Sequence, residues 1–453
     1  MVTAARRIAF DILRRVEAET AYSGELLHAV LSDTRAPIKR EDAALATELT
    51  LGVLRWQRLL DFVIERQTGK PLAGLDLEVL LALRLGLYQL RFLTRVPPSA
   101  AVNESVELVK AARKRSAASL VNAVLRKAPR EEAEKLVPPG LVPETRLGLL
   151  HSHPDWMVAR WLARFGETRT VALLEANNRA PALTCVIHQP DRRQEILQEL
   201  TQAGMRVEPG QWLASAITMR GGNPAATRAF RRGWISMQDE ASQMVALLLD
   251  ARPGQAALDL CAAPGGKTAA LARATGDQAL VIAADLHAHR LRAMEQTMKR
   301  LGIDWVPRVA LDGTASLPFS RMFERILVDA PCSGTGTLAR NPEIRWRLCS
   351  GDLADLHQRQ VALLRNALRL LAPAGRLLFS TCSLEPEENE QVLDEALRDV
   401  PGFRRMTSMD ALQLHVREGA DTARLFSADG AFRTFPPEHG TDGFFAVVVQ
   451  RHE

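Results

Sequence analysis

The sequence predicts a multidomain protein with an all-α N-terminal domain, a small α+β subdomain and a C-terminal α/β domain built on a doubly wound sheet. The chain has 453 residues, more than one hydrophobic core usually fills. Apolar residues recur at helical spacing through residues 1–130, whereas short apolar runs alternate with helical patterns from residue 234 onward. A composition of 47% hydrophobic and 25% charged residues is typical of a globular protein.

The first domain, expected over residues 1–135, is predicted to be entirely helical. Helical patterns start at residue 4 and recur near 41–66, 77–94, 100–114 and 116–127. Residues 1–130 contain 21 Lys and Arg and 14 Asp and Glu, so the positive excess of the chain belongs to this domain. That asymmetry indicates either a polyanionic partner or a solvated helix surface. The densest basic cluster suits phosphate contacts and comprises Lys110, Arg113, Lys114, Arg115, Arg126, Lys127 and Arg130.

A linker and a small subdomain are predicted to follow. Charged residues, prolines and a glycine between Glu131 and Pro143 are typical of a linker. Residues 145–166 have a helical pattern, residues 183–187 have strand composition, 192–203 have helix composition, and short strand-like segments follow at 205–207 and 216–219. We expect a small α+β subdomain over residues 145–230.

The third domain, expected over residues 231–453, alternates strands and helices. Strands are predicted near 256–260, 280–284, 307–310, 325–330, 376–381 and 443–449, with helices between them at 240–250, 267–274, 287–301, 353–372 and 387–399. This alternation predicts a parallel, doubly wound sheet, which binds ligands beyond the carboxyl ends of its strands. We therefore expect the residues that follow these strands to converge at one edge.

A glycine turn follows the first of these strands. It runs through Cys261, Ala262, Ala263, Pro264, Gly265, Gly266 and Lys267. The segment nearly matches a phosphate-binding P-loop, but Cys261 stands where the first glycine should be, and the spacing does not fit G-x-G-x-x-G. A nucleoside cofactor without phosphates is more consistent, because the two glycines allow close backbone approach and the helix start offers free N–H groups.

Two acidic residues end the next two strands. Asp285 lies about twenty residues beyond the glycine turn, where a carboxylate can accept both ribose hydroxyls. Asp312 ends the third strand and could receive an adenine amino group. Either residue alone could instead be a helix cap or a loop residue. A third acidic strand end, Asp329, strengthens the ligand interpretation.

Cysteine usage and hydropathy narrow the class of protein. The five cysteines are odd in number and lack CxxC spacing, which argues against a disulfide framework and a zinc site. The ten histidines have no companions at ligand spacing, so no metal is expected. Charged or amide residues interrupt every apolar run, and the N-terminus lacks the apolar core of a secretion signal. We expect a cytoplasmic protein without a membrane partner.

Three motifs carry a family resemblance. The segments LDLCAAPGGKT (residues 258–268), DAPCSGTG (329–336) and STCS (380–383) resemble those of the S-adenosylmethionine-dependent RNA cytosine-5 methyltransferases. The helical N-terminus resembles the NusB fold, an RNA-binding module. The combination is similar to the RsmB (Sun/Fmu) family, which methylates a cytosine in bacterial 16S rRNA, and covers essentially the whole chain. It implies a Rossmann-like methyltransferase domain, S-adenosylmethionine as cofactor, 16S rRNA rather than DNA as partner, and a monomer.

The resemblance also implies catalytic roles. In this family the Thr-Cys-Ser cysteine, here Cys382, attacks C6 of the base, and the Pro-Cys cysteine, here Cys332, assists release of the product. DNA cytosine-5 methyltransferases attack with Pro-Cys instead, so Cys332 is the alternative nucleophile. Asp329 is expected to lie near the methyl donor and to bond the cytosine N3 or amino edge. Lys267 is expected near the base or cofactor, unless it is a surface residue of the first helical turn.

Other functions and contacts stay open at this point. The segment from Arg340 to Arg347 combines basic side chains with Trp346, which suits a splayed-out nucleotide or a plain amphipathic turn. The same chemistry on tRNA or another RNA, or a non-catalytic RNA-binding factor, are the alternative functions. The intact glycine turn and both cysteines argue against the binding factor.

Overall fold

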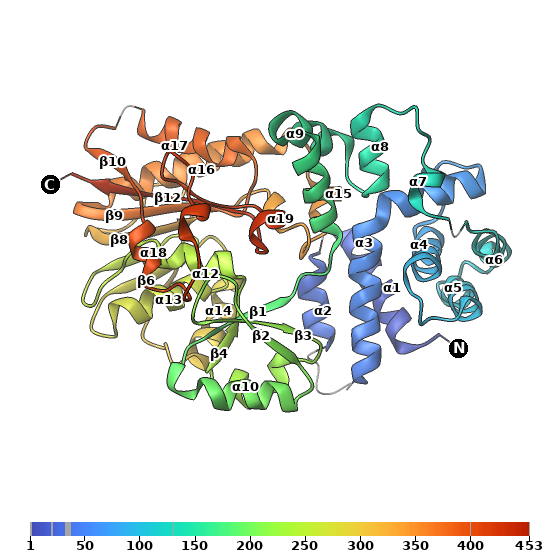
Figure 1. The fold of residues 1–453 in the computed structure, drawn as a ribbon, viewed down its shortest axis with the longest axis horizontal. Helices are drawn as coiled ribbons and strands as arrows, with labels where there is room; N and C mark the ends of the chain where they lie inside the picture. The colour runs from blue at the N-terminus through green and yellow to red at the C-terminus, as the bar shows by residue number, and fades with distance from the viewer. Residues whose placement is uncertain (1, 20, 32–37, 130, 399, 453) are drawn as a thin grey trace. The chain divides into compact units, whose positions relative to one another are not determined.

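The computed structural model describes residues 2–19, 21–31, 38–129, 131–398 and 400–452. The chain divides into two compact units (Figure 1). The helical unit comprises Met1–Ala180 together with Leu338–Ser350, and the sheet unit comprises Pro181–Thr337 together with Gly351–Glu453. The short segment 338–350 therefore leaves the sheet unit and belongs to the helical one.

The N-terminal part of the helical unit is all-α, which confirms the prediction. Its largest helix, α3, is amphipathic, and its core face includes Leu49, Val53 and Leu60, all at most 1% exposed. These side chains pack with Leu13 and with the strongly apolar α4 in one core. The sequence did not predict α2, and Arg130 of the basic cluster lies outside the described residues. The helices are α1 (Ala4–Glu19), α2 (Ser23–Leu31), α3 (Arg40–Thr68), α4 (Leu77–Phe92), α5 (Pro98–Ala111) and α6 (Ala118–Arg126).

Three further helices follow in the first 180 residues of the helical unit: α7 (Ala133–Leu136), α8 (Pro143–Leu150) and α9 (Asp155–Asn178). Helix α15 (Ile344–Arg347) belongs to its second segment. The predicted linker is partly folded, because Leu136 and Val137 are buried. Val137 packs with Leu59 of α3 and with Leu149 of α8. The sequence-based boundaries 1–135, 145–230 and 231–453 stay predictions, since compact units need not coincide with sequence domains.

A small antiparallel sheet begins the sheet unit. Its strands are β1 (Leu183–Ile187), β2 (Arg206–Pro209), β3 (Ala216–Arg220) and β4 (Ile235–Met237), in the order β2-β3-β1-β4. Helix α10 (Arg193–Gln202) places Ile196 and Leu200 in the same core as the buried Cys185 of β1. Cys185 therefore acts as a small apolar core residue.

The large sheet has the strand order β10-β12-β9-β8-β5-β6-β7, with β11 paired to β12 (Figure 1). Strands β5 to β9 form a parallel ladder, as predicted, but β12 pairs antiparallel with β9, β10 and β11. The expectation of a wholly parallel sheet was therefore wrong at this side, and the sheet is mixed. The strands are β5 (Ala257–Asp259), β6 (Val281–Asp285), β7 (Arg308–Ala310), β8 (Phe323–Asp329), β9 (Leu371–Thr381), β10 (Phe403–Met406), β11 (Phe432–Thr434) and β12 (Phe444–Arg451).

Helices cover both faces of the large sheet (Figure 1). Alternate strand residues point to opposite faces, so Leu327 and Leu378 belong to one core and Val328 and Phe379 to the other. The first core includes α12 (Glu240–Leu247), α13 (Gly266–Thr275) and α14 (Ala288–Arg300). The second includes α16 (Asp352–Arg369) and α17 (Glu390–Leu397). The two-sided covering confirms the Rossmann-like α/β class.

Two features are absent from the described residues. None of their helices is long and apolar enough to cross a membrane. In the same part of the chain, no three His, Cys, Asp or Glu side chains gather closely enough to hold a metal ion.

Candidate active site

The carboxyl ends of β5, β6, β8 and β9 bring the predicted residues to one edge of the large sheet. Asp329 and Ser380 form the last register pair of β8 and β9, and Ala330 N donates to Ser380 O over 2.8 Å. The loops that carry Cys332 and Cys382 start immediately beyond this pair. Two cysteines separated by fifty positions in the sequence therefore emerge from neighbouring strands.

The glycine turn is tied to the strands on both sides of β5. Leu260 N donates to Leu327 O of β8 over 3.0 Å, and Ala262 N donates to Ala284 O of β6 over 2.8 Å. Gly265 has a φ of +104°, and a Cβ there would lie 2.8 Å from Met294 Cγ. A side chain at this position would thus be strained and crowded, which explains the glycine.

A buried acid fixes the start of α13. Thr268 Oγ1 donates to Asp259 Oδ2 over 2.6 Å, while the other oxygen, Oδ1, is buried without a hydrogen-bond partner among the described residues. Burial raises the pKa of Asp259 to about 7, although the Thr268 bond opposes this shift. Asp259 was not among the predicted site residues. The signal for it was its place as the last residue of the strand before the turn.

Asp285 supports the glycine turn directly. Its Oδ2 accepts from Ala263 N over 3.1 Å, and its Oδ1 accepts from His287 N over 3.0 Å. Arg290 Nη1 lies 3.7 Å from Oδ2, and Arg290 Nη2 donates to Ala263 O. A carboxylate has about four lone-pair sites, so these contacts leave acceptor capacity for a ligand.

Asp312 has a different environment. It lies in an exposed turn after β7, and its Oδ1 accepts from Thr314 N over 2.9 Å and from Thr314 Oγ1 over 2.6 Å. These two bonds lower the pKa of Asp312. The contact of Asp312 with an adenine therefore stays a prediction, and a local turn-stabilising role fits the same geometry.

Lys267 and Asp329 connect the glycine turn to β8, the strand that precedes Pro331 and Cys332. Lys267 Nζ donates to Asp329 Oδ2 over 2.7 Å, and Ser380 Oγ donates to Oδ1 over 2.8 Å. Lys267 is no surface residue, because its side chain is 12% exposed and its Nζ lies 5.1 Å from the centre of the Phe444 ring. Asp329 is 28% exposed and keeps part of its carboxylate open. The pair places a cation and an anion beside both cysteine loops.

The two cysteine sulfurs lie 3.4 Å apart, and both residues are half-buried. Gly336 N donates to Cys382 O over 2.9 Å, so the two loops also share a backbone bond. The hydrogen bond with Cys382 raises the pKa of Cys332 well above its ordinary value, and burial adds to the effect. Cys332 therefore keeps its proton more readily than a free thiol does.

A buried carboxylate missed by the sequence reasoning lies under these loops. Glu388 is 0% exposed and bonds residues of both loops and of α16. The next residue, Asn389, accepts from Thr381 Oγ1 over 2.5 Å and donates to Ser383 O over 2.9 Å. The available signal was the run Glu385-Pro-Glu-Glu-Asn389 directly after the Thr-Cys-Ser motif, a polar sequence where a strand meets a helix.

Arg345 and Trp346 make hydrogen bonds within the helical unit. Arg345 is 1% exposed, and its guanidinium donates to the carbonyl oxygens of Arg55, Ser152 and Asn177 and to Asn178 Oδ1, all within the helical unit. Trp346 Nε1 donates to Leu54 O over 2.7 Å. The nucleotide-contact interpretation was therefore wrong for Arg345, which is buried, and it stays a prediction for the half-buried Trp346.

The basic cluster of the helical unit is accessible. Arg113, Arg115, Arg126, Lys127 and Lys110 are exposed. Lys110 pairs with Glu107 at 2.8 Å, and the half-buried Lys114 pairs with Asp76 at 3.1 Å. Exposed guanidinium and ammonium groups suit phosphate contacts. Binding of RNA there stays a prediction.

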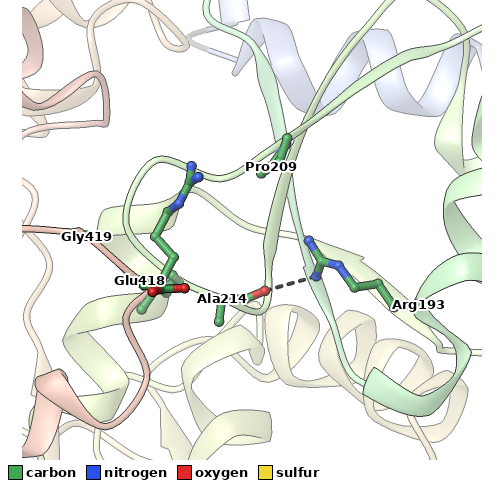
Figure 2. Close-up of a pocket in the computed structure, with 7 residues that line it drawn as sticks. Arg193, Pro209, Ala214, Glu418 and Gly419 are labelled. Carbon is green, nitrogen blue, oxygen red and sulfur yellow. Dashed lines mark hydrogen bonds between the residues drawn. The ribbon is translucent and has the colours of Figure 1, made fainter.

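An open cavity of about 470 Å³ occurs elsewhere in the sheet unit (Figure 2). Arg193 lines it and donates to Ala214 O over 2.9 Å. The cavity contains none of the predicted site residues, and Glu418 offsets the charge of one of its two arginines. The lining comprises Arg193, Pro209, Leu213, Ala214, Arg417, Glu418 and Gly419.

Comparisons with known families cover nearly the whole chain. Residues 246–450 match the 16S rRNA methyltransferase RsmB/F family, residues 3–130 match the NusB family, and residues 153–226 match the RsmF/B-like methyltransferase ferredoxin-like domain.

Two relatives and one solved structure illustrate the similarity. A Bacillus subtilis (strain 168) protein named probable ribosomal RNA small subunit methyltransferase B is 33% identical over 99% of both chains. The ribosomal RNA small subunit methyltransferase B of Pseudomonas putida (strain KT2440) is 36% identical over 90% of both. The crystal structure of PH0851 has a TM-score of 0.82 at 24% identity and covers 100% of both chains, which shows a shared fold.

Proposed function

The chain belongs to the ribosomal RNA small subunit methyltransferase B family, and on that premise we propose that it transfers a methyl group from S-adenosylmethionine to C5 of a cytosine in 16S rRNA. One observation carries the chemistry. The sulfurs of Cys332 and Cys382 lie 3.4 Å apart at the ends of adjacent strands, and the Lys267–Asp329 pair joins them to the glycine turn. A nucleophile, a second thiol and a cofactor turn are thus gathered at one edge.

The glycine turn and the residues around it fit S-adenosylmethionine. Asp285 has acceptor capacity for ribose hydroxyls, and the first turn of α13 offers backbone N–H groups. Leu286, which follows Asp285, is 59% exposed and provides an apolar surface on which a purine could pack. When bound, the cofactor supplies an electrophilic methyl group on a sulfonium sulfur.

We assign the nucleophile to Cys382. Its thiolate adds to C6 of cytosine, which forms a sulfur–carbon bond and gives C5 the electron density it needs to accept the methyl group. After methyl transfer a base removes the C5 proton. The electron pair of the broken C5–H bond forms the C5–C6 double bond, which expels the Cys382 thiolate and restores the aromatic ring. In this proposal Asp329 accepts a hydrogen bond from the amino edge of the base, and the contacts of its carboxylate with Lys267 and Ser380 support that role.

Cys332 suits the release step. Its raised pKa favours the thiol, which can donate its S–H to the neighbouring sulfur of Cys382. A protonated partner stabilises the Cys382 thiolate both before attack and as it leaves.

Cysteine variants test this assignment. We expect Cys382→Ala to abolish methyl transfer to 16S rRNA and to retain S-adenosylmethionine binding, measured by isothermal titration. Cys332→Ala should accumulate a covalent protein–RNA adduct that survives denaturing electrophoresis. Cys349→Ala, which changes an exposed cysteine, is the matched control and should leave both assays unchanged. An adduct that needs Cys332 and survives loss of Cys382 would reverse the roles.

The substrate is tested separately from the chemistry. Bisulfite mapping of RNA from cells lacking the protein should show the loss of a methylated cytosine in 16S rRNA, restored by the wild-type gene and not by Cys382→Ala. Loss of the mark in tRNA alone would retain the chemistry and refute the proposed substrate. No change in any cytosine would indicate a non-catalytic RNA-binding factor.

A further inference from the structure

We propose that Glu388 is a positioning residue that fixes two loops against each other: the Pro-Cys loop, which contains Cys332 and Ser333, and the Thr-Cys loop, which contains Cys382 and Ser383. It thereby keeps the sulfurs of Cys332 and Cys382 in contact. The inference deepens the proposed function and rests on it, because the roles of the two cysteines come from that function. Among the described residues, Glu388 forms no hydrogen bond with either sulfur. It acts through Ser333 and Ser383, the residues that follow the two cysteines.

The hydrogen bonds of Glu388 reach three separate segments. Ser333, which follows Cys332, donates its N–H to Oε1 over 2.7 Å and its hydroxyl to Oε2. Ser383, which follows Cys382, donates its hydroxyl to the same Oε2 over 2.5 Å. Gln360 of α16 donates from Nε2 to Oε1 over 3.0 Å and also to Pro331 O over 2.9 Å. One carboxylate therefore connects the residue after each cysteine to the helix behind them.

Burial gives this arrangement its rigidity. Glu388 is 0% exposed, and Ser333 and Ser383 are 7% and 1% exposed, so water cannot replace a lost partner easily. A carboxylate only accepts hydrogen bonds, and charge-assisted bonds are shorter and stronger than neutral ones. Leaving such a group unpaired in the interior is costly, which favours the single loop arrangement that satisfies all its donors.

The charge of Glu388 has a second effect on the same pair. Its negative charge adds to the Cys382 hydrogen bond and to burial in raising the pKa of Cys332. The carboxylate thereby favours the proton on Cys332, the thiol assigned to release. Two different substitutions test the position of the two sulfurs and the protonation of Cys332 separately.

Glu388→Ala removes the shared acceptor, whereas Glu388→Gln keeps the length of the side chain and removes its charge. In the glutamine variant one oxygen still accepts from Ser333 N and Gln360, and the new NH₂ group donates to the serine hydroxyls, which can rotate to accept. The matched control is Glu240→Gln, which changes another buried carboxylate in the sheet unit, one that accepts from the backbone of Gln211, Trp212 and Leu213.

The distance between the sulfurs is tested by oxidation of the full-length protein with diamide. The two thiols give up two protons and two electrons to the diazene bond of diamide, which becomes a hydrazine, and a Cys332–Cys382 disulfide forms. Sulfurs 3.4 Å apart need only a small approach to reach the bond length of about 2.05 Å. We expect the rate of disulfide formation, followed by mass spectrometry, to fall about tenfold or more in Glu388→Ala because several buried bonds are lost. In Glu388→Gln and Glu240→Gln it should stay within about threefold of wild type.

The protonation effect has its own readout. The pH midpoint of Cys332 alkylation by iodoacetamide, measured in a Cys382→Ser background, should fall in Glu388→Gln and stay unchanged in Glu240→Gln. Methyl transfer by Glu388→Ala should fall about 10²-fold while S-adenosylmethionine affinity is retained, as expected for displacement of reacting groups by about 1 Å.

Each outcome decides the proposal. A folded Glu388→Ala protein that forms the disulfide at the wild-type rate overturns it. If that variant fails to fold, Ser383→Ala removes the hydrogen bond between Glu388 and the residue after Cys382 and should slow disulfide formation about threefold; an unchanged rate overturns the proposal as well. Oxidation requires no RNA and no methyl transfer, so an enzyme that methylates no cytosine refutes the proposed function without deciding this result.

Discussion

Replacing Gly336 by alanine should disable the active site without unfolding the protein. A Cβ on Gly336 would lie 2.1 Å from the carbonyl oxygen of Gly443 and 2.7 Å from its carbonyl carbon, whereas ordinary van der Waals contacts begin at 3.4 Å. The obstacle is backbone, so no side-chain rotation relieves it. The two segments must separate by roughly 1 Å, because steep repulsion forbids closer approach.

That displacement acts on the cysteine loops. Gly336 N donates to Cys382 O over 2.9 Å, and Gly443 N donates to Gly336 O over 2.8 Å. Moving Gly336 therefore strains the bonds that hold the Pro-Cys loop to Cys382 and to the start of β12. Overpacking of this kind costs about 1–3 kcal/mol of stability. A misplacement of about 1 Å in a site of this kind lowers rates about 10²-fold.

The assay is single-turnover transfer of labelled methyl from S-adenosylmethionine to unmodified 16S rRNA, with thermal unfolding measured in parallel. We expect a rate about 10²-fold below wild type. The unfolding temperature should fall by about 2–4 °C for each kcal/mol lost. Gly351→Ala is the control, because a Cβ at that position meets nothing within 4 Å. A Gly336→Ala enzyme within twofold of the wild-type rate would refute the reasoning.

Three further predictions follow from the same geometry. Lys267→Met removes the 2.7 Å ion pair of Asp329, so single-turnover methyl transfer should fall at least about tenfold with S-adenosylmethionine binding retained; an unchanged rate contradicts the pairing role. Arg345→Met leaves four acceptors of the helical unit, three of them in buried hydrogen bonds, without this donor, so chemical denaturation followed by circular dichroism should show about 3–5 kcal/mol less stability, and an unchanged midpoint would count against this. Because burial raises the pKa of Asp259 from 3.8 to about 7, the folded protein holds a proton there that the unfolded chain releases, and this contribution to the free energy of unfolding should decrease as pH rises from about 4 to about 7. Asp259→Asn should flatten that part of the pH–stability profile, and a profile identical to wild type would contradict the shift.

Local patterns were enough to predict the elements and the edge at which they meet. Apolar runs identified all five parallel strands of the large sheet, and parallel pairing carries the residues after each strand to one side. The direction of β12 was beyond this reasoning, because strand composition does not say whether a strand pairs parallel or antiparallel. Strands β10 (Phe-Arg-Arg-Met) and β11 (Phe-Arg-Thr) contain polar side chains and no apolar run, so they gave no strand signal.

Contacts between distant positions explain what the sequence could not predict. Glu388 interacts with Ser333, 55 positions away, and Arg345 interacts with Arg55, 290 positions away. Composition near Arg345 suggested either nucleotide contact or an amphipathic turn, whereas the guanidinium donates to carbonyl groups from three separate parts of the helical unit. A buried charge is recognised from sequence only when its partners are known, and those partners are set by tertiary packing.

The excursion of residues 338–350 into the helical unit has a consequence for synthesis on the ribosome. The carbonyl groups of Arg55, Ser152 and Asn177 accept hydrogen bonds from the guanidinium of Arg345, which is translated much later than they are. An N-terminal fragment released before residue 345 emerges therefore has an incomplete interior, and its nascent form should be more protease-sensitive than the same residues in the finished chain. A protein fragment that contains only the first 180 residues should likewise become more ordered when a peptide spanning residues 338–350 is added.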